Sequence, residues 1–203
     1  MATNAYIVDD DKGFRESLVW LLNGVDIPSQ EFASAEEFLE SYDGGTGCLL
    51  LDIRMGGISG LDLQAKLQQK QLALPVIILT GHGDVPLAVK AMQNGALDFI
   101  EKPFNGEELI KKIKRALKIA RQEEKFLKKK SQYNALWHSL SGRERDVYKL
   151  IVQGKSNKEM AEDLAISVRT LEIHRLRVLK KMEVKNAVEL SQVHEQLQAA
   201  SLL

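Results

Sequence analysis

The first half of the chain alternates short apolar runs with segments whose apolar residues recur at helical spacing. The plainest run, Cys48–Leu51, lies between glycine-rich stretches, which is typical of a short buried strand. Residues 13–23 instead place their apolar side chains on one helical face. The order of these segments predicts an α/β domain, a doubly wound five-stranded parallel sheet with helices on both faces. The predicted strands are residues 5–8, 29–33, 48–51, 75–79 and 98–100. The predicted helices are residues 13–23, 59–69 and 84–94. Two more helices are predicted, one that opens with a capping box at Ser34–Glu37 and one that begins at Gly106.

Polar residues stand where four of these strands end, namely Asp9, Asp10, Asp52, Thr80 and Lys102. The carboxyl ends of parallel strands meet at one edge, where open α/β sheets keep their ligand sites. There the Asp52 carboxylate would attack a phosphoryl group, while Thr80 and Lys102 would bind its oxygens. Each residue also has a plainer role, because an aspartate often starts a turn or caps a helix, and the three acids from Asp9 would need only water. Their combination at one edge favours phosphoryl transfer.

Residues 1–121 resemble the receiver domain of response regulators, which has a flavodoxin-like fold. The matching segments are Val8–Asp10, Leu51–Met55, Leu79–Gly81 and Asp98–Phe104. The resemblance implies that Asp52 accepts a phosphoryl group from a sensor histidine kinase. It also implies that the domain loses this group by autodephosphorylation without being a dedicated enzyme.

The resemblance further implies a Mg²⁺ site. Asp10 and Asp52 would bind the ion, the backbone carbonyl of Arg54 would be another ligand, and Asp9 would act through water. Hard oxygen donors of this kind suit Mg²⁺, which takes one or two carboxylates and keeps several waters.

Thr80 and Phe99 would be the switch pair of the family, and Lys102-Pro103 would be joined by a cis peptide bond. Phosphorylation would move Thr80 toward the phosphoryl group and Phe99 inward, so that the surface of residues 84–104 favours a homodimer. The chain departs from the family at Gly56-Gly57, where the family usually has Pro and then a small or acidic residue. We therefore expect a more mobile loop at this point.

A long helical pattern connects the two halves of the chain. It runs over residues 106–132, but charged residues dominate after Ala120. Residues 122–138 are therefore predicted to be an exposed helical linker, with a flexible coil as the alternative. The run Lys128–Lys130 is typical of a solvated face, although it would also suit DNA phosphates.

Residues 139–203 predict an all-α, four-helix domain. Ser141 and Glu144 fit a capping box at the start of the first helix. Two short helices joined by a tight turn, the second rich in Arg and Lys, are typical of a helix-turn-helix. A small protein-binding bundle is the alternative. The second, third and fourth helices are predicted at residues 156–164, 168–182 and 187–199.

The third helix of this half is the predicted recognition helix. Leu171, Val178, Leu179 and Met182 are its predicted packing positions. Arg, Lys and Thr bind phosphates, while Arg and Glu also reach base edges in the major groove. The predicted DNA-binding residues are Arg169, Thr170, Glu172, Ile173, His174, Arg175, Leu176, Arg177, Lys180 and Lys181.

This half resembles the LuxR-type DNA-binding domain of NarL/FixJ response regulators. The matching segments are Leu140–Glu144, Gly154–Ala161, Val168–Arg175, Lys180–Met182 and Ala187–Leu190. The chain has Gly142 and Glu183 where the family usually has Pro and Gly, and neither lies on the proposed DNA-facing surface. The resemblance implies regulation of transcription on double-stranded promoter DNA, and it allows RNA polymerase as a further partner.

Charge divides unevenly between the two halves of a chain whose net charge is zero. Residues 1–121 hold 13 basic and 17 acidic side chains, whereas residues 122–203 hold 15 and 11. A basic second half favours a nucleic-acid partner. The single cysteine excludes an internal disulfide, and no apolar run or signal-peptide pattern indicates a membrane, so we expect a cytoplasmic protein.

Together these features predict a two-component response regulator that binds DNA as a dimer after phosphorylation. The first alternative is an enzyme, a phosphatase or phosphotransferase with an aspartyl-phosphate. Such enzymes usually carry a second Asp two residues after the nucleophile, where this chain has Arg54. The second alternative is a binding protein that does not depend on phosphorylation, and the intact acidic cluster disfavours it.

Overall fold

The computed structural model describes residues 3–70, 72, 74–81 and 85–199, which form two compact units. The first unit comprises residues 1–125 and the second residues 126–203. Helix α5, Gly106–His138, begins in the first unit and ends in the second. It is helical through residues 122–138, so the predicted helical linker is present and the flexible-coil alternative is wrong.

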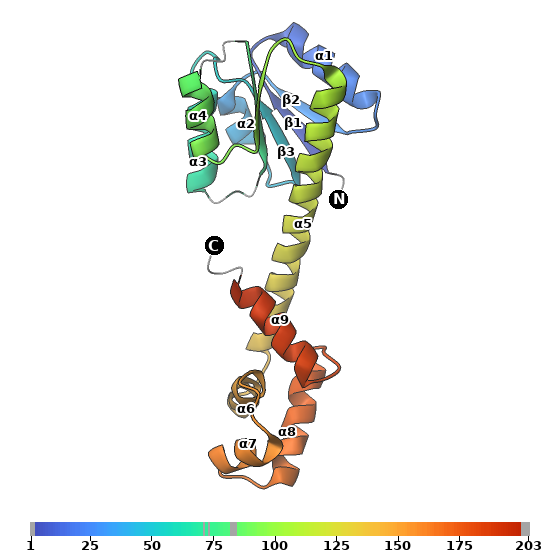
Figure 1. The fold of residues 1–203 in the computed structure, drawn as a ribbon, viewed down its shortest axis with the longest axis vertical. Helices are drawn as coiled ribbons and strands as arrows, with labels where there is room; N and C mark the ends of the chain where they lie inside the picture. Colours follow the sequence, from blue (N-terminus) through green and yellow to red (C-terminus); the bar gives the residue numbers. More distant parts are fainter. Residues whose placement is uncertain (1–2, 71, 73, 82–84, 200–203) are drawn as a thin grey trace. The chain divides into compact units, whose positions relative to one another are not determined.

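The first unit is a five-stranded parallel sheet with the strand order β2-β1-β3-β4-β5. This arrangement, with helices between successive strands, confirms the predicted fold class (Figure 1). The strands are β1 (Asn4–Val8), β2 (Ser29–Phe32), β3 (Gly47–Leu51), β4 (Val76–Thr80) and β5 (Asp98–Glu101). The helices are α1 (Lys12–Asn23), α2 (Ala35–Ser41), α3 (Gly60–Gln69), α4 (Val85–Gln93) and the first part of α5.

Helices cover both faces of the sheet, and each face has its own core. One core packs Leu18 of α1 and Ile113 of α5 against the sheet, and the other packs Phe38 of α2 and Leu63 of α3 (Figure 1). Strand β3 is buried along its whole length because its side chains enter both cores. This explains why it is a continuous apolar run rather than an alternating one.

Several predicted boundaries differ from the structure by one or two residues. Asp84, the predicted first residue of the helix 84–94, lies outside the described residues. The capping box predicted at Ser34 is only half present: Ser34 accepts from the N–H of Glu37, but the Glu37 carboxylate accepts from the N–H of Ala33. The capping box between Ser141 and Glu144 is complete.

Cys48 lies at the centre of the sheet, where solvent is excluded. Its side chain is fully buried in β3 between α1 and α5, with no measurable exposed area. Burial raises the pKa of its thiol from 9.0 to about 12, because the charged thiolate loses its hydration. The cysteine is therefore a core residue, as the apolar run around it predicted.

The second unit contains the end of α5 and four further helices (Figure 1). They are α6 (Gly142–Val152), α7 (Asn157–Asp163), α8 (Val168–Lys181) and α9 (Ala187–Ala199). Leu171, Val178 and Met182 of the predicted packing set are buried here with Val147 and Leu190. Within the part of the chain that the structure describes, no helix has both the length and the apolar character to cross a membrane.

Candidate functional site

The strand register brings the predicted acidic residues together at one edge of the sheet. Val8 of β1 lies beside Leu51 of β3, so the residues that follow, Asp9 and Asp52, leave the sheet next to each other. The N–H of Asp52 donates to the carbonyl of Val8 at 2.9 Å and fixes this juxtaposition. Both carboxylates are almost fully buried.

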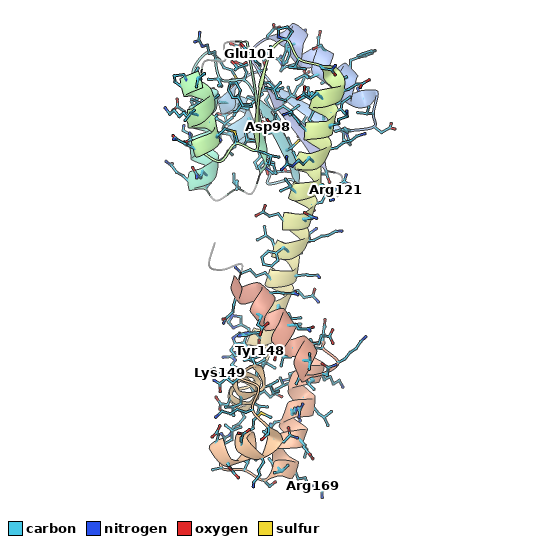
Figure 2. The ribbon with its side chains drawn as sticks, viewed as in Figure 1. Asp98, Glu101, Arg121, Tyr148, Lys149 and Arg169 are labelled. Carbon is cyan, nitrogen blue, oxygen red and sulfur yellow. The ribbon has the colours of Figure 1, made fainter. Side chains whose placement is uncertain are left out.

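Lys102 joins these two carboxylates. Strand β5 ends beside β4, where the N–H of Lys102 donates to the carbonyl of Thr80. In Figure 2, Asp98 and Glu101 mark this strand, and Lys102 follows it. Its Nζ lies 2.6 Å from Oδ2 of Asp9 and 3.0 Å from Oδ1 of Asp52, and the Lys102-Pro103 peptide is cis, as the sequence predicted.

Asp52 is held by donors on both oxygens. Oδ1 accepts from Lys102, and Oδ2 accepts from the N–H of Arg54 at 2.7 Å. Burial raises the pKa of Asp52, while the hydrogen bond and charge of Lys102 oppose that shift. The carboxylate is thus buried, oriented through both oxygens and paired with the Lys102 cation.

Asp9 and Asp10 are held differently. The two oxygens of Asp9 accept from Lys102 and from the N–H of Asp11, so both are engaged. Asp10 is exposed, and its Oδ2 accepts from the N–H of Gly56 at 3.3 Å. Among the described residues, no other hydrogen bond to Asp10 is present.

The oxygen ligands at this edge suit Mg²⁺, which keeps several of its waters, better than they suit an ion that needs protein ligands on all sides. They are hard carboxylate oxygens, among them those of Asp10 and Asp52. Within the described residues, no group of three or more His, Cys, Asp or Glu side chains is placed to hold a metal ion by itself. Mg²⁺ is usually bound through one or two carboxylates and keeps several waters, so these residues fit it.

Thr80 and Phe99 end up on the two strands beside this edge. Thr80 closes β4 with only 1% of its surface exposed, and Phe99 lies in β5, partly buried against the core that contains Leu63. They are not directly paired, because Phe99 is opposite Ile78 and Thr80 is opposite Glu101. The two residues of the predicted switch pair therefore lie on neighbouring strands, and Thr80 is more deeply buried than Phe99.

Sequence reasoning missed three residues that shape this edge. Arg15 of α1 is buried and donates through Nη1 to the carbonyl of Asp9 at 2.7 Å. Phe14 lies under Lys102, with Nζ 3.7 Å from the ring centroid, which favours the cation. Glu36 of α2 reaches the loop after β3. All three residues lie in helices, and no local sequence motif indicates that their side chains contact the sheet edge or the loop after β3.

The predicted recognition helix, α8, has a polar face toward solvent. Ser167 caps it by accepting from the N–H of Thr170. Arg169, labelled in Figure 2, lies in the first turn of the helix. Ile173 and Leu176 are unusually exposed for apolar residues, at 46% and 68%. The exposed residues that share one helical stripe are Arg169, Glu172, Ile173, Leu176, Arg177 and Lys180.

Three of the predicted DNA-binding residues point into their own unit. Arg175 donates to the side chain of Asn157 in α7. Lys181 binds Glu144 of α6 at 2.7 Å and the carbonyl of Ser139 at 3.2 Å. His174 has a buried Nδ1 without a hydrogen-bond partner in the described structure. Arg175 and Lys181 therefore face α7 and α6, which carry their partners, rather than the exposed stripe of α8.

Family models match both halves of the chain. The model of the response regulator receiver domain matches residues 5–114. The model of bacterial regulatory proteins of the luxR family matches residues 138–194.

Known proteins resemble the chain over nearly its whole length. The response regulator protein TmoT of Ectopseudomonas mendocina is 42% identical over 95% of this chain and 88% of its own. The transcriptional regulatory protein FixJ of Bradyrhizobium diazoefficiens is 40% identical over 91% of each chain. The solved structure of the response regulator StyR is 34% identical, with a TM-score of 0.87 over 97% of this chain and 100% of that one.

These matches agree with the geometry of both units. The sheet edge carries the acidic and basic residues expected of a receiver domain, and the second unit carries a helix-turn-helix. The chain is therefore a two-component response regulator with a LuxR-type DNA-binding domain, a transcriptional regulator that belongs to the NarL/FixJ family.

Proposed function

We propose that Asp52 accepts a phosphoryl group from a sensor histidine kinase and that this controls binding to promoter DNA. The observation that carries the proposal is the placement of Asp52, buried at the sheet edge with Lys102 on one oxygen. The Asp52 carboxylate would attack phosphorus, and the kinase histidine would leave with the electron pair of the broken P–N bond. Mg²⁺ would offset the phosphoryl charge when bound.

The residues around Asp52 take separate roles in this proposal. Asp10, Asp52 and the carbonyl of Arg54 hold Mg²⁺, and Asp9 acts through water. Lys102 and the Thr80 hydroxyl bind phosphoryl oxygens. Hydrolysis by water would return Asp52 to its free form, so the protein turns itself off without being a dedicated enzyme.

Phosphorylation then promotes dimerisation through α4 and β5. Thr80 moves toward the phosphoryl group and Phe99 turns inward, which shifts a pre-existing equilibrium of the domain. Helix α4 supports this choice of surface, because Val85, Val89 and Met92 lie on one face and are 76%, 49% and 48% exposed. A stripe of this kind on a soluble domain marks an interaction surface.

A dimer presents two α8 helices to a two-fold DNA site. We infer that residues 1–121 are the phosphoacceptor domain, residues 122–138 the helical linker and residues 139–203 the DNA-binding domain. A promoter-binding protein acts where the chromosome is, so the proposal includes a cytoplasmic location and allows contact with RNA polymerase.

Intact-mass measurement tests the phosphoacceptor directly. With acetyl phosphate and Mg²⁺, the wild-type protein should gain one phosphoryl group and D52N should gain none. The substitution keeps the size and one acceptor oxygen of the side chain but removes the nucleophilic carboxylate. Equal labelling of the two proteins would show that Asp52 is not the acceptor.

A further inference from the structure

Alternate N–H groups of the loop between β3 and α3, residues 53–59, bind three carboxylates: Asp52 just before the loop, Asp10 after β1 and Glu36 in α2. The pairs are Arg54 with Asp52 at 2.7 Å, Gly56 with Asp10 at 3.3 Å and Ile58 with Glu36 at 2.8 Å. Two of these contacts, those of Gly56 and Ile58, join the loop to segments far from it in the sequence. Asp10 and Asp52 belong to the proposed metal site, whereas Glu36 lies outside it in α2.

The Glu36 end of the loop is closely fitted. Oε1 of Glu36 accepts from a residue 22 positions later, so it joins α2 to the loop. Gly57, the residue before Ile58, has a φ of +82°, and a Cβ there would lie 2.6 Å from the same Oε1. Only glycine allows both the backbone turn and the approach of the carboxylate.

The Gly56 contact reaches the least constrained member of the metal site. Asp9 and Asp52 are buried and both bind Lys102, but Asp10 is exposed. An exposed aspartate samples several rotamers unless a partner holds it. Within the described residues, the N–H of Gly56 is its one such partner, and it occupies Oδ2.

We propose that Glu36 and the N–H of Gly56 are positioning groups for the metal site, an inference that rests on the proposed function. Glu36 fixes the loop from α2, and the fixed loop places the Gly56 N–H so that Asp10 keeps one orientation, with Oδ1 left for the ion. Partners of ligating carboxylates commonly change metal affinity by about 10–100-fold when removed. A partly exposed contact belongs at the lower end of that range.

The first experiment compares G56P with G56A in the full chain. Proline removes the N–H, whereas alanine keeps it. Alanine also fits, because no atom lies within 4 Å of a Cβ at this position and the backbone is outside the left-handed region. Calorimetric titration with Mg²⁺ should show affinity about 10-fold weaker for G56P and unchanged within about 2-fold for G56A.

The second experiment approaches the loop from α2 and leaves its backbone intact. E36A removes the acceptor of the Ile58 N–H, E36Q keeps an acceptor oxygen, and E40A removes an exposed carboxylate one helical turn away as a control. E36A should bind Mg²⁺ about 3–10-fold more weakly, and the Ile58 amide should exchange its hydrogen faster. E36Q should recover most of the affinity, and E40A should match the wild type.

The outcomes separate this inference from the proposed function. No heat of Mg²⁺ binding and no acetyl-phosphate labelling in the wild type would refute the proposed function. Normal wild-type binding together with equal affinities for G56P and G56A would refute the role of the Gly56 N–H. Faster exchange at Ile58 in E36A without loss of Mg²⁺ affinity would refute the role of Glu36, even if G56P does not fold.

Discussion

The ion pair between Glu144 and Lys181 should stabilise the second unit in a pH-dependent way. Glu144 begins α6 as a capping-box residue, is only 4% exposed and accepts from Lys181 at the end of α8. The hydrogen bond from Lys181, followed by that from the N–H of Ser141, lowers the pKa of Glu144 from 4.5 to about 2. The perturbation we choose is E144Q, which keeps the shape and removes the charge.

The magnitude follows from the lowered pKa. A pKa lowered from 4.5 to about 2 corresponds to at most about 3 kcal/mol between the charged and neutral forms of Glu144. The Lys181 side chain is 40% exposed, so solvent screens part of this interaction, and Gln can still accept from Ser141. We therefore expect E144Q to lower the free energy of unfolding by about 1–2 kcal/mol at pH 7.

The sign of the pH dependence follows from the direction of the shift. A carboxyl group whose pKa is lower in the folded state stabilises the protein above its unfolded value and loses this effect as pH falls through its folded value. The gap between wild type and E144Q should thus be full at pH 6–7, shrink below about 4.5 and vanish near about 2.

The assay is urea unfolding followed by tryptophan fluorescence in a W20F background. Trp20 is 79% exposed in the first unit, so its removal leaves Trp137, which packs on Tyr148 in the second. D146N is the control, because the Asp146–Arg143 pair lies on the same helix at 4.0 Å and is exposed, with an expected cost under about 0.5 kcal/mol. Equal destabilisation by E144Q and D146N, or a difference between wild type and E144Q that persists to pH 2, would show that the charged Glu144–Lys181 pair does not stabilise this unit.

The remaining predictions concern DNA and dimerisation. K180A should weaken binding to all DNA sequences about equally and flatten the salt slope by roughly one unit in titrations at several salt concentrations. E172A should alter base preference on a randomised site, with a loss of roughly 1–3 kcal/mol at the preferred site; unchanged preference in both E172A and L176A would exclude α8 as the reader. Beryllium fluoride with Mg²⁺ should raise the dimer fraction in sedimentation, and V89E should prevent this by placing a charge in the apolar stripe of α4; a V89E protein that still dimerises would exclude that surface.

The sequence was sufficient to predict the fold and to predict that Asp9, Asp52 and Lys102 meet at one edge of the sheet. A buried parallel strand must be apolar on both faces, so a run such as Cys48–Leu51 is unambiguous, and the residue after it lies at the carboxyl edge. The side chains that meet Asp52 could be predicted because each follows a strand directly. Lys102 confirms this, since it contacts both Asp9 and Asp52.

The sequence did not predict the contacts between a helical side chain and a residue far from it in the chain. Position along α8 does not reveal that Arg175 turns to Asn157 or that Lys181 turns to Glu144, because both contacts depend on how α6 and α7 pack. Glu36 falls within the stretch Ser34–Glu37 that was predicted to open a helix with a capping box, and nothing in the sequence indicated a role for its own side chain. Its real partner lies 22 residues away, which no local pattern encodes.

The buried thiol of Cys48 can be used to measure how often the folded sheet opens. A thiol reagent reacts with the thiolate, and here both the burial and the pKa of about 12 prevent that reaction in the folded state. Alkylation must wait until β3, the strand that contains Cys48, is released from its neighbours. Because the chain has one cysteine, its rate of labelling under native conditions measures how often this sheet opens. The ratio of the rates with and without beryllium fluoride and Mg²⁺ would give the free energy by which activation stabilises the sheet.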